Sequence, residues 1–256
     1  MKIQQVAVQL YTLRDFTKTP ADIAATLKKV RALGYQAVQA SALGPIEENE
    51  LLKMLHGEGL ALAATHEDAA TILDSPHAVV EKLKKLNCKY TAYPFPRGID
   101  FSAESQIHAL ARKLDAAGAV LREAGQVLTY HNHAIEFVKF GDKLVLEMIY
   151  DETSPQNLQA EIDTYWVQYG GGNPVEWCQR LANRLPLLHM KDYKFMRENK
   201  HEMAEIGVGN LDWKAIIAAA EKSGCEWFIV EQDYCPGDPF DSLKASFDYI
   251  SANLIG

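Results

Sequence analysis

The chain lacks any apolar run that approaches the ~20 residues needed to cross a bilayer as a helix. Residues 1–11 are too few and too polar for a secretion signal, and they alternate in polarity as a strand does. We therefore expect a cytoplasmic protein that does not contact a membrane.

Positive charge is also scarce, because 26 Lys and Arg residues stand against 34 Asp and Glu residues, for a formal net charge of -8. A surface of this sign repels phosphate backbones on average. Nucleic acid is therefore not an expected partner.

Cysteine is infrequent and never paired in the sequence. The four residues, Cys88, Cys178, Cys225 and Cys235, form no CxxC motif, which argues against a structural zinc site. We expect all four to be reduced and mostly buried.

Linker sequences are absent as well, since the 10 prolines and 16 glycines are scattered and no Ser, Gly or charge run is long. A length of 256 residues is close to that of one (β/α)8 barrel, and 48% apolar residues can fill a large core. Residues 1–256 are therefore predicted to form a single domain.

Short β-rich runs alternate with amphipathic helical stretches along the whole chain. The predicted strands are 6–10, 37–39, 60–65, 90–93, 127–130, 158–162, 187–190 and 227–230. The predicted helices run from Thr19-Pro20 to Gly34 and over 47–56, 76–86, 102–124, 174–181, 213–222 and 242–250, with a short, poorly defined helix after the fifth strand.

Eight strand–helix units close a barrel more naturally than they build an open sheet, so the predicted fold is a (β/α)8 TIM barrel of the α/β class. A doubly wound open sheet is the alternative. No GxGxxG turn follows the first strand, which weakens that alternative.

Polar side chains gather where the predicted strands end, which is the active-site face of this kind of barrel. They are His66 and Glu67 after the third strand, His131, His133 and Glu136 after the fifth, Glu161 and Asp163 on the sixth, His189, Lys191 and Asp192 after the seventh, and Glu231 and Asp233 after the eighth. A single such residue often caps a helix, but converging carboxylates repel one another unless a cation lies between them. We therefore predict a divalent metal site with oxygen and imidazole ligands.

Residues two apart on a strand face the same way, so His131 and His133 point together, as do Glu161 and Asp163. Asp163 is nearer the rim and is the better ligand. Glu161 lies deeper, where a buried, hydrogen-bonded structural role is favoured.

Five segments of the chain resemble the xylose-isomerase-like TIM barrels, a superfamily of sugar phosphate isomerases/epimerases that also includes a DNA-repair AP endonuclease. They are VAVQLYTLRD (6–15), YHNHAIEF (130–137), EIDTYWV (161–167), LLHMKD (187–192) and FIVEQD (228–233). The resemblance implies one divalent ion (Mn, Mg, Co or Zn) bound by a fifth-strand carboxylate together with Asp163, His189 and Glu231. Glu136 is the predicted fourth ligand, with His131 or His133 as substitutes. Gln39 stands where the second strand of such barrels commonly ends in Glu.

The resemblance implies an isomerase or epimerase of a ketose, in which Glu136 and Glu231 exchange a proton on an enediolate. The alternative is a lyase or dehydratase of a keto-sugar or 3-keto-glycoside, in which His131 or His133 protonates a leaving oxygen. Lys191 either stabilises the enediolate or binds an anionic group of the substrate, or it pairs with Asp192 or Glu231.

His66, Tyr11 and Trp166 are predicted to contact the carbohydrate substrate, the last two through their rings. An endonuclease would need a basic groove, and a non-catalytic sugar-binding barrel would lack ligands that this chain has. Barrels of this family are often oligomeric, so a homo-oligomer is a further expectation.

Overall fold

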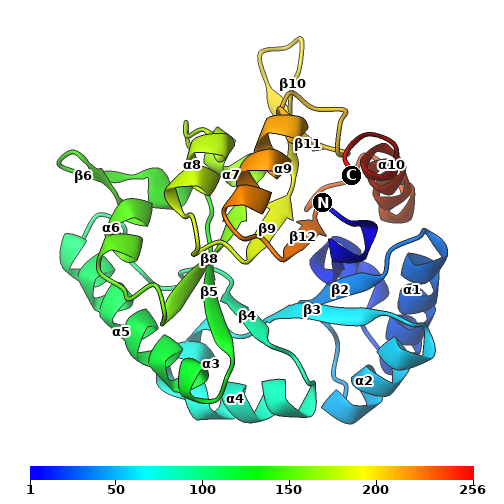
Figure 1. Ribbon diagram of the computed structural model, residues 1–256, viewed down its shortest axis with the longest axis horizontal. Coiled ribbons are helices and arrows are strands. Elements are labelled where there is room, and N and C mark those ends of the chain that lie inside the picture. Colours follow the sequence, from blue (N-terminus) through cyan, green and yellow to red (C-terminus); the bar gives the residue numbers. More distant parts are fainter.

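A computed structural model describes all residues 1–256, which form one closed barrel of eight strands (Figure 1). Neighbouring strands are parallel, and the last pairs with the first, so the barrel has no edge. In barrel order the strands are β1 (Val6–Gln9), β2 (Ala37–Ala40), β3 (Ala61–His66), β4 (Tyr90–Tyr93), β5 (Val127–His131), β8 (Leu158–Asp163), β9 (Leu187–Met190) and β12 (Trp227–Val230). The predicted (β/α)8 barrel is confirmed, and the open sheet is excluded.

Helices surround the barrel on its outside (Figure 1). They are α1 (Pro20–Ala32), α2 (Glu48–Gly57), α3 (Ala69–Asp74), α4 (Pro76–Lys85), α5 (Glu104–Glu123), α6 (Val145–Asp151), α7 (Thr164–Tyr169), α8 (Pro174–Arg180), α9 (Trp213–Lys222) and α10 (Pro239–Asn253). Each strand and helix predicted with bounds is present within three residues of the predicted limits, whereas α3 and α7 were not predicted.

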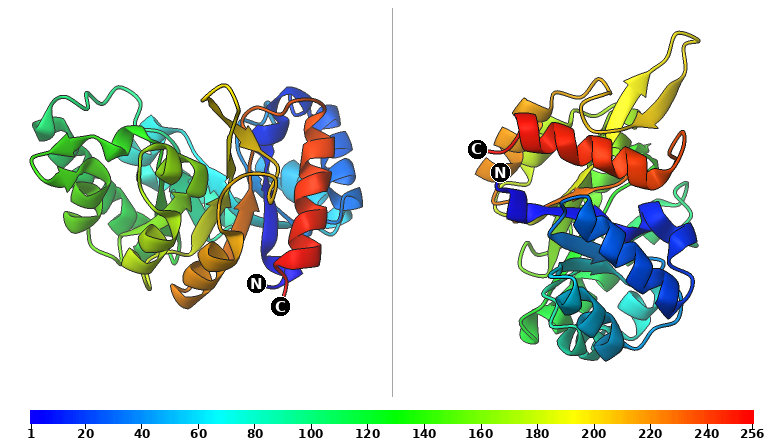
Figure 2. Two further views of the ribbon diagram at one scale, coloured as in Figure 1. Left: turned by 90° about the horizontal axis from the view of Figure 1, so that it is seen from above. Right: turned by 90° about the vertical axis from the view of Figure 1, so that its right-hand side faces the viewer.

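Two small hairpins interrupt the alternation of strand and helix. The first, β6 (Lys139–Phe140) and β7 (Lys143–Leu144), lies between β5 and α6, where the sequence predicted only a poorly defined helix. The second, β10 (Asp192–Phe195) and β11 (His201–Ala204), follows β9 and projects away from the barrel (Figure 2).

Helix α1 shows why the predicted start and stop signals hold. Thr19 Oγ1 accepts a hydrogen bond from the Asp22 amide (3.2 Å), and the Asp22 carboxylate accepts one from the Thr19 amide (3.1 Å). Pro20 occupies the first turn, where its missing N–H is not needed. After the helix, Gly34 has φ +112°, and a Cβ there would lie 2.3 Å from the Phe247 ring, so this position needs glycine.

The inside of the barrel is apolar toward the start of the strands and polar toward their end. Ala7, Ala37 and Leu187 belong to a cluster of seven buried residues, and each lies two positions before an inward-facing polar residue on its strand. Those polar residues, Gln9, Gln39 and His189, are fully buried. The site therefore begins inside the barrel and opens at the carboxyl ends of the strands.

The chain ends lie side by side (Figure 2), where the Gly256 amide donates a hydrogen bond to the Met1 carbonyl (3.2 Å). The four cysteines form no disulfide, and all except Cys235 are buried. None of the helices combines the length and the apolar character needed to span a bilayer.

Candidate active site

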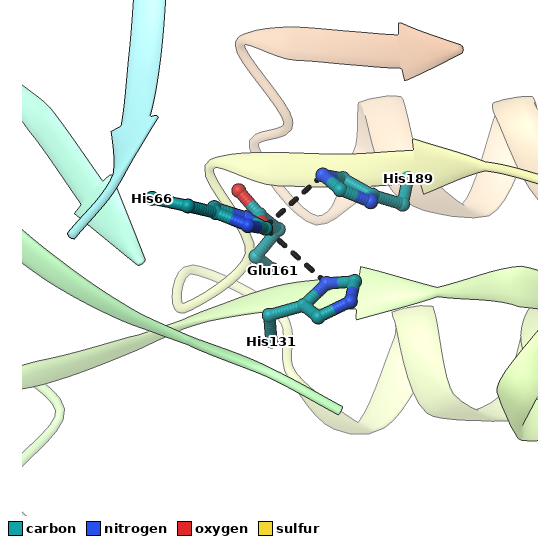
Figure 3. Close-up of side chains that lie close together, drawn as sticks. All are labelled: His66, His131, Glu161 and His189. Carbon is teal, nitrogen blue, oxygen red and sulfur yellow. Dashed lines mark hydrogen bonds and ion pairs between the residues drawn. The ribbon is translucent and has the colours of Figure 1, made fainter. Parts of the chain in front are cut away.

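Three imidazoles converge on one carboxylate oxygen inside the barrel (Figure 3). Glu161 Oε1 lies 2.5 Å from His66 Nε2, 3.1 Å from His189 Nε2 and 3.3 Å from His131 Nδ1. The other oxygen of Glu161 accepts a hydrogen bond from Gln39 Nε2 (2.7 Å). Glu161 is buried and hydrogen bonded, as expected, but its position at the centre of the histidines was not predicted.

A second group of charges lies beside the first, around the buried ammonium of Lys191. Its Nζ atom is 2.7 Å from Glu231 Oε2, 3.0 Å from Asp163 Oδ2 and 3.2 Å from Asp233 Oδ2. Burial lowers the pKa of Lys191, but the three carboxylates outweigh it and raise the pKa well above its ordinary value. The predicted pairing with Glu231 is therefore present and extends to two further carboxylates.

Asp192 does not pair with Lys191. Its fully buried carboxylate turns to the segment that precedes α9 and accepts hydrogen bonds from the amides of Gly207 (2.8 Å) and Gly209 (3.1 Å) and from Trp213 Nε1 (2.8 Å). Asp192 thus ties that segment to the end of β9.

His189 links the two groups. Its Nδ1 atom lies 2.9 Å from Glu231 Oε2, and its Nε2 atom lies 2.7 Å from Gln39 Oε1. Burial disfavours the charged imidazole, but Glu161 and Glu231 outweigh this and raise the pKa of His189 to about 10. The ring is thereby held between carboxylates on both sides.

Two overlapping sets of buried side chains could each hold a metal ion. One comprises His66, His131, Glu161 and His189, and the other comprises His131, Asp163, His189 and Glu231. Imidazole nitrogen and carboxylate oxygen are donors that suit divalent first-row ions. His131 Nδ1 and Asp163 Oδ2 are buried and form no well-aligned hydrogen bond, although each lies at ion-pair distance from a partner. These two atoms are therefore available as metal ligands. The residues present therefore fit a divalent ion.

Three of the four predicted ligands, Asp163, His189 and Glu231, come together, but the structure does not bring Glu136 to them. Glu136 lies in the 3-10 turn Ile135–Phe137 and is fully buried. Its two oxygens accept hydrogen bonds from the Tyr130 hydroxyl (2.9 Å) and the His133 amide (2.8 Å). Burial raises the pKa of Glu136 to about 7.

A cleft of about 880 Å³ opens above these groups. Most of the residues predicted for catalysis or substrate contact line it, and they are Tyr11, His66, His131, His133, Trp166, Lys191 and Glu231. Asp163, His189 and Glu136 do not line it. A second cavity of about 650 Å³ lies at α8 and α9 and contains none of the predicted site residues.

His133 stands in the wall of this cleft among aromatic rings. Its ring centroid is 5.0 Å from that of Phe95 and 5.5 Å from that of Trp166. Burial lowers the pKa of His133 well below its ordinary value, which keeps the imidazole neutral. A neutral imidazole beside a cleft can accept a proton.

Comparisons with known proteins agree with this architecture. Residues 27–252 match the family described as Xylose isomerase-like TIM barrel. The inosose dehydratase of Geobacillus kaustophilus is 24% identical to this chain, and the alignment covers 88% of this chain and 85% of that protein. The inosose dehydratase of Geobacillus thermodenitrificans is also 24% identical, but its alignment covers only 57% of this chain and 54% of that protein. A solved sugar phosphate isomerase/epimerase from Parabacteroides distasonis superposes with a TM-score of 0.82 at 22% identity and covers 98% of this chain and 99% of that one.

Proposed function

Because the chain belongs to the xylose isomerase-like TIM barrel family, we propose that it is a metal-dependent lyase that removes water from a small keto-sugar or ketone of a cyclic polyol. The expectation from the sequence was an isomerase or epimerase, with this lyase as the alternative. The placement of Glu136 reverses that order of preference.

The proposal depends mainly on the position of Glu136, because it leaves the cleft with only one of the two predicted carboxylate bases. Proton exchange on both faces of an enediolate needs two bases that reach the substrate. Glu231 lines the cleft, but both oxygens of Glu136 are bound to Tyr130 and His133 away from it. The cleft offers imidazoles instead, and the name inosose dehydratase borne by similar proteins is consistent with elimination.

A divalent ion bound in the cluster around His131 and His189 would polarise the ketone oxygen and acidify the adjacent C–H bond. Of the predicted ligands, Asp163, His189 and Glu231 remain a prediction, whereas Glu136 is bound to Tyr130 and His133 instead.

The chain's own groups can then carry the proton. His133 accepts it from the carbon next to the carbonyl. His133 next gives the same proton to the oxygen on the following carbon. The C–O bond breaks, a C=C bond forms beside the carbonyl, and water leaves; from a glycoside, an alcohol would leave instead. One residue therefore acts as base and then as acid.

The test is incubation with an inosose and a panel of ketoses and keto-glycosides in deuterated water, followed by mass spectrometry and ultraviolet absorbance. We expect a conjugated ketone lighter than its substrate by one water, or by one alcohol from a glycoside. His133→Asn should slow its formation about 10²–10⁴-fold. The matched control is His108→Asn, because His108 is a half-buried histidine on α5 that does not line the cleft, and its rate should equal that of the wild type.

Other outcomes identify the alternatives. Deuterium in a recovered ketose without loss of water, abolished in Glu136→Gln, would establish the isomerase or epimerase instead. Sugar binding that is indifferent to a chelator, with no turnover, would indicate a non-catalytic barrel. Cleavage of abasic DNA would indicate an endonuclease, which the net charge of -8 disfavours.

A further inference from the structure

We propose that the cleft holds two sugar rings, and that the group eliminated from the keto-sugar is a second, uncharged sugar bound along helix α3. The proposal rests on the proposed function, because it names the leaving group of that elimination as the hydroxyl of a sugar in place of water. The substrate class is then a keto-disaccharide or a longer keto-glycoside.

The cleft is larger than one sugar needs. Its volume is about 880 Å³. A single sugar ring with its substituents has about a dozen heavy atoms, and even at ~30 Å³ for each, the share of a whole water molecule, it would fill less than half of this volume. One ring bound beside the imidazoles therefore leaves space for a second ring of the same size.

The cleft extends from the imidazoles along helix α3. His66 lies at the end of β3, and α3 begins three residues later. Residues from both ends of α3 line the cleft, and they are Ala69, Ala70, Leu73 and Asp74. At 1.5 Å per residue, the part of the cleft along this helix is about 7 Å long, which is enough for a sugar ring. We call this part of the cleft the extension.

The other wall of the extension begins beside the proposed base. His133 protonates the departing oxygen, so the leaving group must lie next to its ring. Phe95 contacts that ring edge to face, with centroids 5.0 Å apart, and is 44% exposed. Beyond Phe95, the same segment contributes Arg97 and the apolar Ile99 to the cleft. A group attached to the departing oxygen therefore passes Phe95 and enters the extension.

The charges of the extension suit an uncharged sugar. The charged side chains that line it are Glu67, Asp68, Asp74, Arg97 and Lys113. Asp74 pairs with Lys113 (3.2 Å), and Glu67 pairs with Lys82 of α4 (2.8 Å). The remaining two, Asp68 and Arg97, have opposite charges. The extension therefore has no excess charge to attract an anion, whereas its donors and acceptors together suit hydroxyl groups, which both donate and accept hydrogen bonds.

The reaction then needs no further reactant. His133 removes the proton from the carbon next to the ketone, and the electron pair of that C–H bond forms a C=C bond to the following carbon. The bond from this carbon to the glycosidic oxygen breaks, and the oxygen takes the same proton from His133. The products are an unsaturated keto-sugar and the second sugar with a free hydroxyl group.

The test compares 3-keto-cellobiose and 3-keto-maltose, oxidised on the non-reducing ring, with the methyl 3-keto-glucosides of the same two anomers. Turnover is measured by the release of glucose or methanol, and binding by calorimetry with the slow variant His133→Asn. We expect one disaccharide to bind more than about 10-fold more tightly than its methyl glycoside, since one or two added hydrogen bonds suffice for this. Its kcat/KM in the wild type should be higher by a similar factor.

Two matched substitutions locate the second ring. Ala70→Trp places a large side chain in the extension, and Ala78→Trp alters an exposed alanine on α4 that does not line the cleft. The ratio of kcat/KM between disaccharide and methyl glycoside should fall at least about 10-fold in Ala70→Trp and should keep its wild-type value in Ala78→Trp. This ratio does not depend on the fraction of folded protein. Arg97→Ala should also lower it, and it replaces Ala70→Trp if that variant does not fold.

The other outcomes separate the inference from the proposed function. Equal affinity and equal kcat/KM for disaccharide and methyl glycoside would overturn the second ring and leave the proposed lyase intact. If no substrate is turned over, the proposed function fails, and the binding preference and its loss in Ala70→Trp decide the inference alone. Tighter binding of a keto-disaccharide whose departing ring is a uronic acid would overturn the uncharged second sugar.

Discussion

The substitution Asp192→Asn should destabilise the fold, because this fully buried carboxylate has no cationic partner and depends on N–H donors alone. Oδ2 accepts three hydrogen bonds, and Oδ1 accepts one from the Tyr193 amide (2.8 Å) and a long one from the Leu211 amide (3.4 Å). An asparagine can keep its oxygen at the Oδ2 position, but its NH₂ group then faces the two donors at Oδ1. A hydrogen bond to a charged group contributes about 1.5–3 kcal/mol, so we expect a loss of about 3 kcal/mol.

A loss of that size lowers the melting temperature of a chain of this length by roughly 6–12 °C. Urea and thermal unfolding measure it, and the Gly207 and Gly209 amides should exchange with deuterium faster. The matched control is Asp212→Asn in the same segment, where Oδ1 accepts one hydrogen bond from the Ala215 amide (3.1 Å) as the cap of α9. Asn caps helices as well as Asp does, so this change should stay within about 0.5 kcal/mol. Equal effects of the two substitutions would refute the assigned role of Asp192.

Three further predictions concern stability in excess chelator. Lys191→Met leaves the buried carboxylates of Asp163 and Glu231 and the half-buried one of Asp233 without their cation, and should cost about 3–5 kcal/mol in urea unfolding. The double variant with Asp233→Asn should recover part of this loss, and wild-type stability of Lys191→Met would contradict the ion-paired group. Burial raises the pKa of Glu136 in the folded protein from 4.5 to about 7. The stabilisation that its protonated carboxyl gives to the folded state is therefore complete below pH 4.5 and is lost as the pH rises through 7. The wild type should therefore lose about 3 kcal/mol relative to Glu136→Gln between pH 4.5 and 8, and parallel pH profiles would exclude this. Gly118→Ala would place a Cβ 1.9 Å from the Asn157 carbonyl oxygen and should cost about 1–3 kcal/mol, whereas Gly57→Ala, with no atom within 4 Å, should be neutral or stabilising.

The barrel could be predicted because its signals are local. Buried strands and capped helices alternate, and signals such as Thr19-Pro20 and Gly34 hold in the structure. Helix α7 was missed because it begins directly after β8, without a separating turn, and its cap is Asp163 itself. The first hairpin was missed because its strands have only two residues each, and the second because its strands are polar and largely unburied, unlike the buried strands of the barrel.

The orientation of Glu136 could not be predicted in the same way. Alternation along a strand determines which face a side chain occupies, and it brought His131 to the cluster. Glu136 lies beyond the end of β5 in a 3-10 turn, where alternation no longer applies. There the carboxylate turns back to the Tyr130 hydroxyl and the His133 amide, a preference that only the three-dimensional path of the turn reveals.

The choice between Glu161 and Asp163 shows a second limit of reasoning along the chain. Both face the barrel interior, and the greater depth of Glu161 led the sequence interpretation to favour Asp163 as ligand. Depth alone does not show which charges surround each carboxylate, because those charges come from neighbouring strands. Lys191 Nζ lies 3.0 Å from Asp163 Oδ2, whereas His189 Nε2 lies 3.1 Å from Glu161 Oε1. Since Lys191 and His189 belong to the neighbouring unit of the barrel, these pairings follow only once the strands are placed side by side.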